Sequence, residues 1–171
     1  MGSGTGNSSE TLGTLTPLAG NSVVTLIAGA GQQANVSVGS FGTVPTGASY
    51  LFRGTSLGLG SLVAGTATLS SGTSVTLVGT GSTGSAAKSI LPYALIDSSV
   101  VGVGTSFATI DSVGATGTAN AMVRALNASE YAATLSAGSN ILLATGTVLS
   151  GTLSLSVQSL TLASGGSVAL N

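Results

Sequence analysis

The segment TLASGGSVAL (residues 161–170) repeats, almost letter for letter, the segment TLSSGTSVTL (residues 68–77). Seven of the ten positions are identical, without a gap, at a distance of 93 residues. In both segments apolar residues alternate with small polar residues on either side of a glycine, and this period of two is typical of a β-strand. Glycine reaches positive φ without steric cost, so it favours a turn between two strands. The repeat therefore predicts strand, turn and strand at both places.

Similar patterns extend this prediction along the chain. A looser copy, TLTPLAGNSVVTL (residues 14–26), contains Pro17, which indicates a bulge or an edge because proline cannot donate to a strand ladder. In the last quarter, the alternation places the aliphatic side chains of each of three segments on one face of a strand: Leu153, Leu155 and Val157; Leu160 and Leu162; and Val168 and Leu170. Further strands are predicted at residues 35–38, 49–52, 74–78, 106–110 and 140–144.

Short strands with frequent glycine turns fit either a β-sandwich or a β-solenoid. A sandwich usually has aromatic core anchors and charged outer faces, whereas this chain has 4% aromatic and 4% charged residues. We therefore predict an all-β fold, a parallel β-solenoid with coils of about 20 to 25 residues. The repeated segment then forms the same corner in different coils, and aliphatic side chains form continuous interior ladders.

One stretch departs from this pattern. Residues 119–135 contain few glycines and several residues that favour a helix. Asn127 is followed three residues later by Glu130, which is the spacing of a capping box at the start of a helix. We predict one short helical excursion from a coil, at about residues 128–135.

Several of these stretches resemble a known family. The segments of the form TLxSGxSVxL resemble the autotransporter-associated β-strand repeats of very large bacterial surface proteins. The middle of the chain resembles a recurrent module of the same proteins, through YLFRGTSLG (50–58), ILPYALID (90–97), GTSFATID (104–111) and RALNASEYAATL (124–135). The resemblance spans nearly the whole chain, about residues 10–170. It implies a right-handed parallel β-helix in an exported, cell-surface or extracellular fibre, and it implies no catalytic residue.

The composition argues against several classes of function. Three basic residues oppose four acidic ones, so the chain has nothing to neutralise a row of phosphates or to hold an anionic membrane, and we expect no nucleic-acid partner. The chain has no His and no Cys, which removes the commonest general base and the commonest metal ligands. No apolar run approaches the ~18 residues of a membrane span, so we expect no membrane insertion. We also expect no cofactor and no metal.

Two glycine motifs have a functional and a structural interpretation. GTSLG (residues 54–58) matches the nucleophile elbow G-x-S-x-G, with Ser56 as the nucleophile, but the chain lacks the histidine that would take its proton. GTGSTG (residues 79–84) matches the dinucleotide fingerprint G-x-G-x-x-G, with Asp97 further on. That site needs a helix directly after the loop, and Pro92 interrupts the stretch where this helix would run. Both motifs are therefore interpreted as turns or loops.

Three carboxylates are the candidates for acid–base chemistry: Asp97, Asp111 and Glu130. A pair of carboxylates cleaves glycosidic bonds in most glycoside hydrolases. A helix cap explains Glu130, however, and Asp97 and Asp111 lie beside turns, where Asp bonds to local backbone. Arg53 and Arg124 are expected to pair with the two aspartates. We expect no enzyme and no catalytic residue.

The sequence predicts one functional module. Residues 1–9, which begin MGSG, are expected to be a flexible tag remnant, and residues 10–171 a single solenoid module. A surface with few charges and open strand ends predicts stacking of the module on copies of itself, into a homo-oligomer or filament. We expect a structural module of an extracellular bacterial fibre or adhesin, located at the cell surface or outside the cell. The alternative is a carbohydrate-binding or carbohydrate-cleaving domain, with surface glycans as the ligand.

Overall fold

A computed structural model describes residues 6–58, 65, 67–71, 75–111, 121–144, 146, 148–150 and 155–169. The chain divides into two compact units, the first from residues 1–77 and 91–125 and the second from residues 78–90 and 126–171. The described residues form twelve strands and one 3-10 turn: β1 (Ser8–Leu15), β2 (Asn21–Leu26), β3 (Ala34–Phe41), β4 (Ser49–Gly54), β5 (Ala67–Ser71), β6 (Ala94–Asp97), β7 (Ser106–Ile110), β8 (Ala121–Ala125), η1 (Ala128–Glu130), β9 (Asn140–Leu143), β10 (Val148–Ser150), β11 (Ser159–Leu162) and β12 (Ser167–Ala169).

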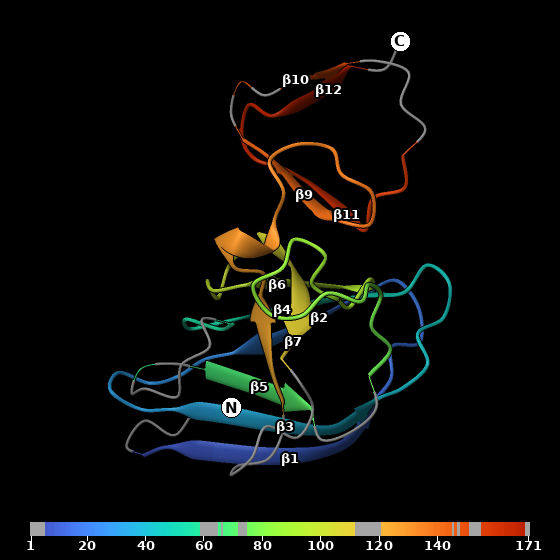
Figure 1. Cartoon of the computed structure of the whole chain (residues 1–171). Helices are drawn as coiled ribbons and strands as arrows, with labels where there is room; N and C mark the ends of the chain where they lie inside the picture. Colours follow the sequence, from blue (N-terminus) through green and yellow to red (C-terminus); the bar gives the residue numbers. More distant parts are fainter. Residues whose placement is uncertain are drawn as a thin grey trace. The chain divides into compact units, whose positions relative to one another are not determined.

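The first unit contains an eight-stranded sheet in the order β1-β3-β5-β8-β7-β6-β4-β2. Strands β1, β3 and β5 are parallel neighbours, as Figure 1 shows, and β2, β4 and β6 form a second parallel set. Strands β8 and β7 join the two sets through three antiparallel pairings. The order is nested, because the earliest strands of the sequence lie at the two edges and the latest lie in the middle.

The predicted right-handed parallel β-solenoid is wrong. Antiparallel pairs interrupt the parallel ladder, and the described strands divide into separate sheets of eight, two and two strands. The spacing between paired strands is also uneven, since Ser8 pairs with Ala34, 26 residues on, whereas Tyr50 pairs with Ala94, 44 residues on. The turn at residues 98–104 reverses the chain between β6 and β7, so these strands pair antiparallel and end the repeat of parallel strands.

The predicted helix at residues 128–135 is also wrong in length. The turn η1 ends at Glu130, and Tyr131 is already extended, with φ −117° and ψ 144°. Ala132 then forms a parallel bridge with Ile141, and its N–H donates to the carbonyl of Asn140 at 2.7 Å. Pairing with β9 requires extended backbone, and this requirement overrides the local helix preference.

The two copies of the repeated segment do not occupy equivalent corners. The second copy forms strand, turn and strand as predicted: β11 ends, Gly165 turns with φ 81°, and β12 follows. The first copy begins as β5, but residues 75–77 are not a strand, and residues 72–74 lie outside the described part of the chain. Strand β5 belongs to the eight-stranded sheet, whereas β11 and β12 pair with β9 and β10 in two separate sheets.

The burial that an interior ladder would give to Leu160 and Leu162 of β11 is wrong. Leu160 and Leu162 are 41% and 50% exposed, although their partners in β9, Ile141 and Leu143, are fully buried. Paired residues of parallel strands in register share a face, so Leu160 and Leu162 lie on the same face as Ile141 and Leu143. The leucines stay exposed because no further described strand covers β11. Among the other five residues of the predicted set, Leu155 and Val168 are also exposed and Val157 is half-buried, while Leu153 and Leu170 lie outside the described part of the chain.

Aromatic rings occupy the core of the first unit. Tyr50 and Phe52 stack with their centroids 5.1 Å apart, and Phe41 packs against both rings. Tyr93 meets Tyr50 edge-on at 6.4 Å. Four of the six aromatic residues of the chain thus gather in one cluster, and aromatic pairs of this geometry stabilise a core by about 0.5–1.5 kcal/mol beyond the area that they bury.

Candidate functional site

Ser56 occupies a turn directly after β4. Among the described residues it is the one non-glycine residue with positive φ, at 53°, which is the strained backbone that a nucleophile elbow also has. Its N–H donates to the carbonyl of Ser98 at 3.0 Å. No hydrogen bond joins its hydroxyl to a base in the described part of the chain. The arrangement is therefore a turn with a strained residue, without the partner that acyl transfer requires.

The glycine loop at residues 79–84 packs closely within the second unit. A Cβ atom at Gly79 would lie 2.0 Å from the side-chain amide oxygen of Gln158, and the N–H of Gly84 donates to Oε1 of Glu130 at 3.0 Å. Gly81 bridges Lys88, and no helix follows this loop among the described residues. The loop N–H that a dinucleotide phosphate would need is thus engaged by a carboxylate.

Asp97 closes the turn at residues 98–104. It is 5% exposed, Oδ1 accepts a hydrogen bond from the N–H of Ser99 at 2.9 Å, and Oδ2 accepts one from the N–H of Gly104 at 3.1 Å. A Cβ atom at Gly102 would lie 2.0 Å from the Asp97 carboxyl carbon, so the loop passes closely over the carboxylate. The predicted backbone-bonding role of Asp97 is confirmed.

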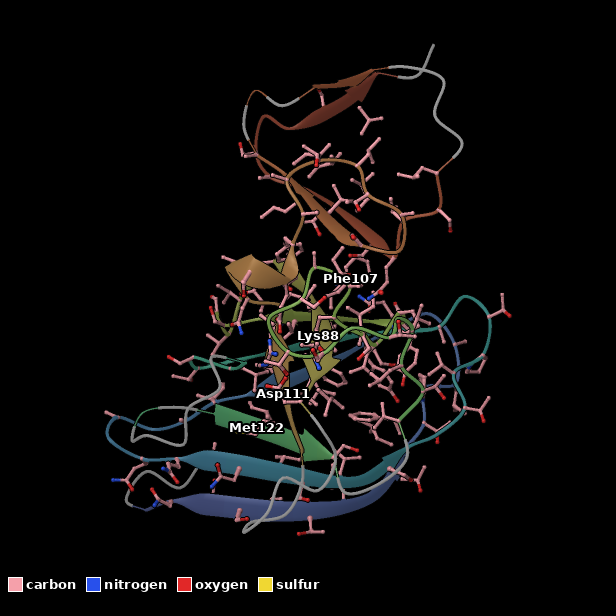
Figure 2. The ribbon with its side chains drawn as sticks, viewed as in Figure 1. Lys88, Phe107, Asp111 and Met122 are labelled. Carbon is pink, nitrogen blue, oxygen red and sulfur yellow. The ribbon has the colours of Figure 1, made fainter. Side chains whose placement is uncertain are left out.

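Arg124 and Asp111 form a forked ion pair in the first unit. The guanidinium donates from Nε to Oδ2 at 2.5 Å and from Nη2 to Oδ1 at 2.6 Å, and it is buried. This pairing was predicted, whereas Arg53 does not pair with an aspartate among the described residues. Its Nε donates to the hydroxyl of Thr25 at 3.0 Å and its Nη1 to the carbonyl of Gly102 at 3.1 Å. Figure 2 labels Asp111.

Glu130 lies fully buried in the second unit. Its Oε2 accepts a hydrogen bond from the N–H of Asn127 at 2.8 Å, as the capping-box spacing predicts, and its Oε1 holds the glycine loop. The three candidate carboxylates thus hold local backbone or an arginine. In the described part of the chain, His, Cys, Asp and Glu do not gather in any group of three that would hold a metal ion.

A groove in the first unit combines aromatic and polar side chains. It has a volume of about 390 Å³ and lies where β2, β4 and β6 begin, with further walls from the loop after β6 and from β7. We call it the aromatic groove, and it is lined by Asn21, Ala48, Ser49, Tyr50, Leu51, Pro92, Tyr93, Ala94, Leu95, Val103 and Phe107. Figure 2 labels Phe107. None of the lining residues is charged.

The hydroxyl of Tyr50 is buried without a partner. Tyr50 is 2% exposed, and its phenolic oxygen makes no hydrogen bond in the described structure. Such a group costs about 1–3 kcal/mol of stability unless something from outside the chain pairs with it. Burial raises the pKa of Tyr50, and burial together with the neighbouring Tyr50 raises the pKa of Tyr93 to about 12, so both phenols are neutral at physiological pH.

Asn21 and Ser49 form the polar rim of the groove. They face each other across the β2–β4 pair, and the hydroxyl of Ser49 donates to Oδ1 of Asn21 at 3.3 Å. The amide nitrogen of Asn21 keeps its donors for other partners. Sequence reasoning missed this site, because Tyr50 and Ser49 were predicted only as members of a strand. The available signal was that Tyr50 and Tyr93 are two of the six aromatic residues of the chain.

Two strand edges, one in each unit, are further candidate surfaces. Strand β1 lies at one end of the eight-stranded sheet and is exposed over most of its length, with Leu12 at 43%. Strand β11 pairs only with β9 among the described strands and exposes Leu160 and Leu162. An exposed edge presents unpaired N–H and C=O groups to any strand that approaches it.

No family model, curated protein or solved structure matches the chain, so the resemblance to autotransporter-associated repeats stays an expectation. None of the helical segments in the described part of the chain has the length and apolar character needed to cross a membrane.

Proposed function

We propose that the chain is a structural, non-enzymatic module of an extracellular bacterial fibre or adhesin, and that copies of it associate through their strand edges. The observation that carries this proposal is the pair of exposed apolar edges, β1 with Leu12 and β11 with Leu160 and Leu162. We infer that the β1 edge of one copy pairs with the β11 edge of the next. A contact between two different surfaces leaves one surface of each kind free on the outermost copies, so it can add further copies in a row.

Few charges protect these edges. Edge strands of monomeric proteins are commonly blunted by lysine, proline or a charge that points inward. Strand β1 carries one charged residue, Glu10, which is exposed on the same face as Leu12. Strand β11 carries none. These edges therefore carry few charges that would oppose pairing with another strand, in keeping with a chain that is only 4% charged.

The expected affinity determines the protein concentration that an association assay needs. Completing the burial of Leu12, Leu160 and Leu162 contributes about 1 kcal/mol each, half the value for a fully exposed leucine. A four-residue ladder adds a few hydrogen bonds at about 1 kcal/mol each, and the loss of translational and rotational freedom opposes both contributions. Association is therefore weak, and it requires protein concentrations up to the millimolar range.

Sedimentation velocity between about 10 μM and 1 mM tests the proposal. We expect the mean mass to rise with concentration, Leu12→Lys and Leu160→Lys to keep the chain monomeric, and Glu10→Gln to strengthen association. Val101→Lys is the matched control, because Val101 is also exposed but lies in a loop. A chain that stays monomeric at 1 mM contradicts edge pairing.

The location requires its own test. An antibody against the chain should label the surface or the medium of intact producing cells. Labelling that appears only after lysis contradicts an extracellular role.

A further inference from the structure

We propose that Glu10 makes association through the β1 edge depend on pH, so that copies pair more tightly when this carboxylate is protonated than when it is ionised. The inference rests on the proposed function, because it concerns the same edge, and it adds the condition under which that edge accepts a partner. Three observations support it: Glu10 lines an apolar hollow, no basic residue lies in the strands around it, and the partner edge carries no charge.

Glu10 lies on the core-facing side of β1. On the same side of this strand, Ser8 pairs with Ala34, which is 4% exposed, and Leu12 pairs with Val38, which is fully buried. Alternate residues of a strand and paired residues of parallel strands share a face, so Glu10 faces the same way as this buried row. Glu10 and Leu12 are exposed because β1 is the last strand at this end of the sheet, as Figure 1 shows.

Both edges of the eight-stranded sheet border one apolar hollow beside Glu10. The hollow has a volume of about 150 Å³, and its walls come from Ser8, Glu10 and Leu12 of β1, from Leu26 of β2 and from residues 34–36 of β3. Strands β1 and β2 are the two ends of the strand order. Glu10 is the one charged residue of these walls, so a partner strand that covers the hollow also covers a carboxylate.

No basic residue is placed to compensate the charge of Glu10. Strands β2, β3 and β11 contain no charged residue. Of the three basic residues of the chain, Lys88 and Arg124 are 4% and 5% exposed, and Arg53 donates to β2 and to the turn at residues 98–104. Removal of an ionised carboxylate from water without a partner charge is costly, and such a group takes up a proton instead.

The other three acidic residues differ from Glu10 in this respect. Asp97 and Glu130 accept hydrogen bonds from backbone N–H groups, and Asp111 pairs with Arg124. The carboxylate of Glu10 accepts no hydrogen bond and forms no ion pair in the described part of the chain. Water alone therefore stabilises its charge, and a strand that displaces this water removes that stabilisation.

The partner edge replaces the water with apolar surface. Leu160 and Leu162 of β11 lie on the face of the fully buried Ile141 and Leu143. A pairing that continues the core-facing sides of both copies over the hollow therefore sets a leucine beside Glu10. The neutral carboxyl group can still donate to a hydroxyl or carbonyl there, whereas the ionised group gains no cation.

The direction of the pH dependence follows from this difference. Glutamate side chains in water are ionised above about pH 5 and neutral below about pH 4. Because pairing favours the neutral form, each contact takes up one proton, and the association constant falls by up to about tenfold for each pH unit above about 5. Association is thus strongest below about pH 4 and weakens as pH rises.

Sedimentation velocity at up to about 1 mM protein, between about pH 4.5 and 7.5, tests the proposal. We expect the association constant of the unmodified chain to fall by at least about tenfold over this range. Glu10→Gln keeps the shape of the side chain without its charge, so it should associate at pH 7.5 about as strongly as at pH 4.5. Circular dichroism at each pH checks that the fold is kept.

Leu12→Lys is the control for association that does not use the β1 edge. The formal net charge of −1 passes through zero on acidification, and a protein without net charge associates less specifically. We expect Leu12→Lys to stay monomeric at both pH values, because it blocks the edge while the net charge still changes with pH. Any association that this variant keeps at pH 4.5 is subtracted from that of the unmodified chain.

Two results would overturn this proposal and leave edge pairing intact. One is an association constant of the unmodified chain that is equal at pH 4.5 and 7.5. The other is the same pH dependence in Glu10→Gln, which would assign it to another group. If neither the unmodified chain nor Glu10→Gln associates at any pH, edge pairing and its pH dependence are both refuted.

Discussion

Replacement of Asp97 by alanine should destabilise the first unit by about 2–4 kcal/mol. The substitution removes both acceptors that hold the turn at residues 98–104, at 2.9 Å from the N–H of Ser99 and at 3.1 Å from the N–H of Gly104. A hydrogen bond to a charged group contributes about 1.5–3 kcal/mol, and a donor left buried without a partner costs a similar amount. Two such bonds give 3–6 kcal/mol, and water that reaches the loosened turn recovers part of this loss. Asp97→Asn keeps one acceptor oxygen and should cost about half as much.

Urea unfolding followed by circular dichroism measures this loss. With a slope of about 1–3 kcal/mol per molar urea, the midpoint of Asp97→Ala should fall by about 1–2 M. At about 10 μM protein, where copies do not associate, Glu10→Gln is the control, because that carboxylate is exposed and its removal should change stability by less than about 0.5 kcal/mol. A midpoint equal to that of the unmodified chain refutes the view that Asp97 holds the turn. A polysaccharide-cleaving activity lost in Asp97→Ala at unchanged stability would instead make Asp97 a catalytic residue.

Three further predictions follow from the same structure. Gly58→Ala should lower the free energy of unfolding by more than about 2 kcal/mol, because φ at Gly58 is +77° and the new Cβ would lie 2.6 Å from the side chain of Ile96. Gly47→Ala should lower it by only about 1 kcal/mol, because φ is +80° there but the space around it is open. Thermal melts compare the two variants. Arg124→Lys should lower stability by about 1–3 kcal/mol in urea unfolding, because lysine cannot make the fork to Asp111. The pKa of Tyr93 rises from 10.0 to about 12 in the folded chain, so the stability that the neutral phenol contributes is fully present below pH 10 and is lost as pH rises toward 12. The free energy of unfolding should therefore fall between about pH 9 and 12, and Tyr93→Phe should make this fall less steep.

Local strand signals in the sequence were largely sufficient to find strands. The predicted strand at residues 106–110 coincides with β7, and those at residues 49–52 and 35–38 lie inside β4 and β3. Pro17 follows the end of β1, as its inability to donate to a ladder predicts. The strand predicted at residues 74–78 is wrong, since Val78 makes an isolated bridge with Ile90 and residues 75–77 are not extended into a ladder.

Pairing and direction could not be predicted in the same way. The two-residue period of apolar positions shows which residues share a face of a strand. It does not show which strand lies beside which, or whether the neighbouring strand runs parallel. The reversal between β6 and β7 depends on Asp97 reaching Ser99 and Gly104, a contact that no periodic pattern encodes. For the same reason Leu160 and Leu162 were assigned to an interior, although β11 has no further strand over it among those described.

The aromatic groove was beyond sequence reasoning for a related reason. Its walls come from residues 21, 48–51, 92–95, 103 and 107, which meet only because β2, β4, β6 and β7 are neighbours. The local bonds of Asp97 and Glu130, by contrast, could be predicted, because Ser99, Gly104 and Asn127 lie close to them along the chain. Short-range chemistry is visible in the sequence, whereas a site assembled from distant strands is not.

The nested strand order has a consequence for how such a sheet could change size. Because β1 and β2 occupy opposite margins, the first 26 residues supply both borders at once, and their removal would uncover β3 and β4 together. A duplicated segment of about the length between Ser8 and Ala34 would likewise widen the sheet by one strand on each side, and the aromatic cluster and the reversing turn would keep their places. Insertions and deletions in this part of a gene can therefore add or remove one strand at each edge of the sheet, while the central strands keep their neighbours.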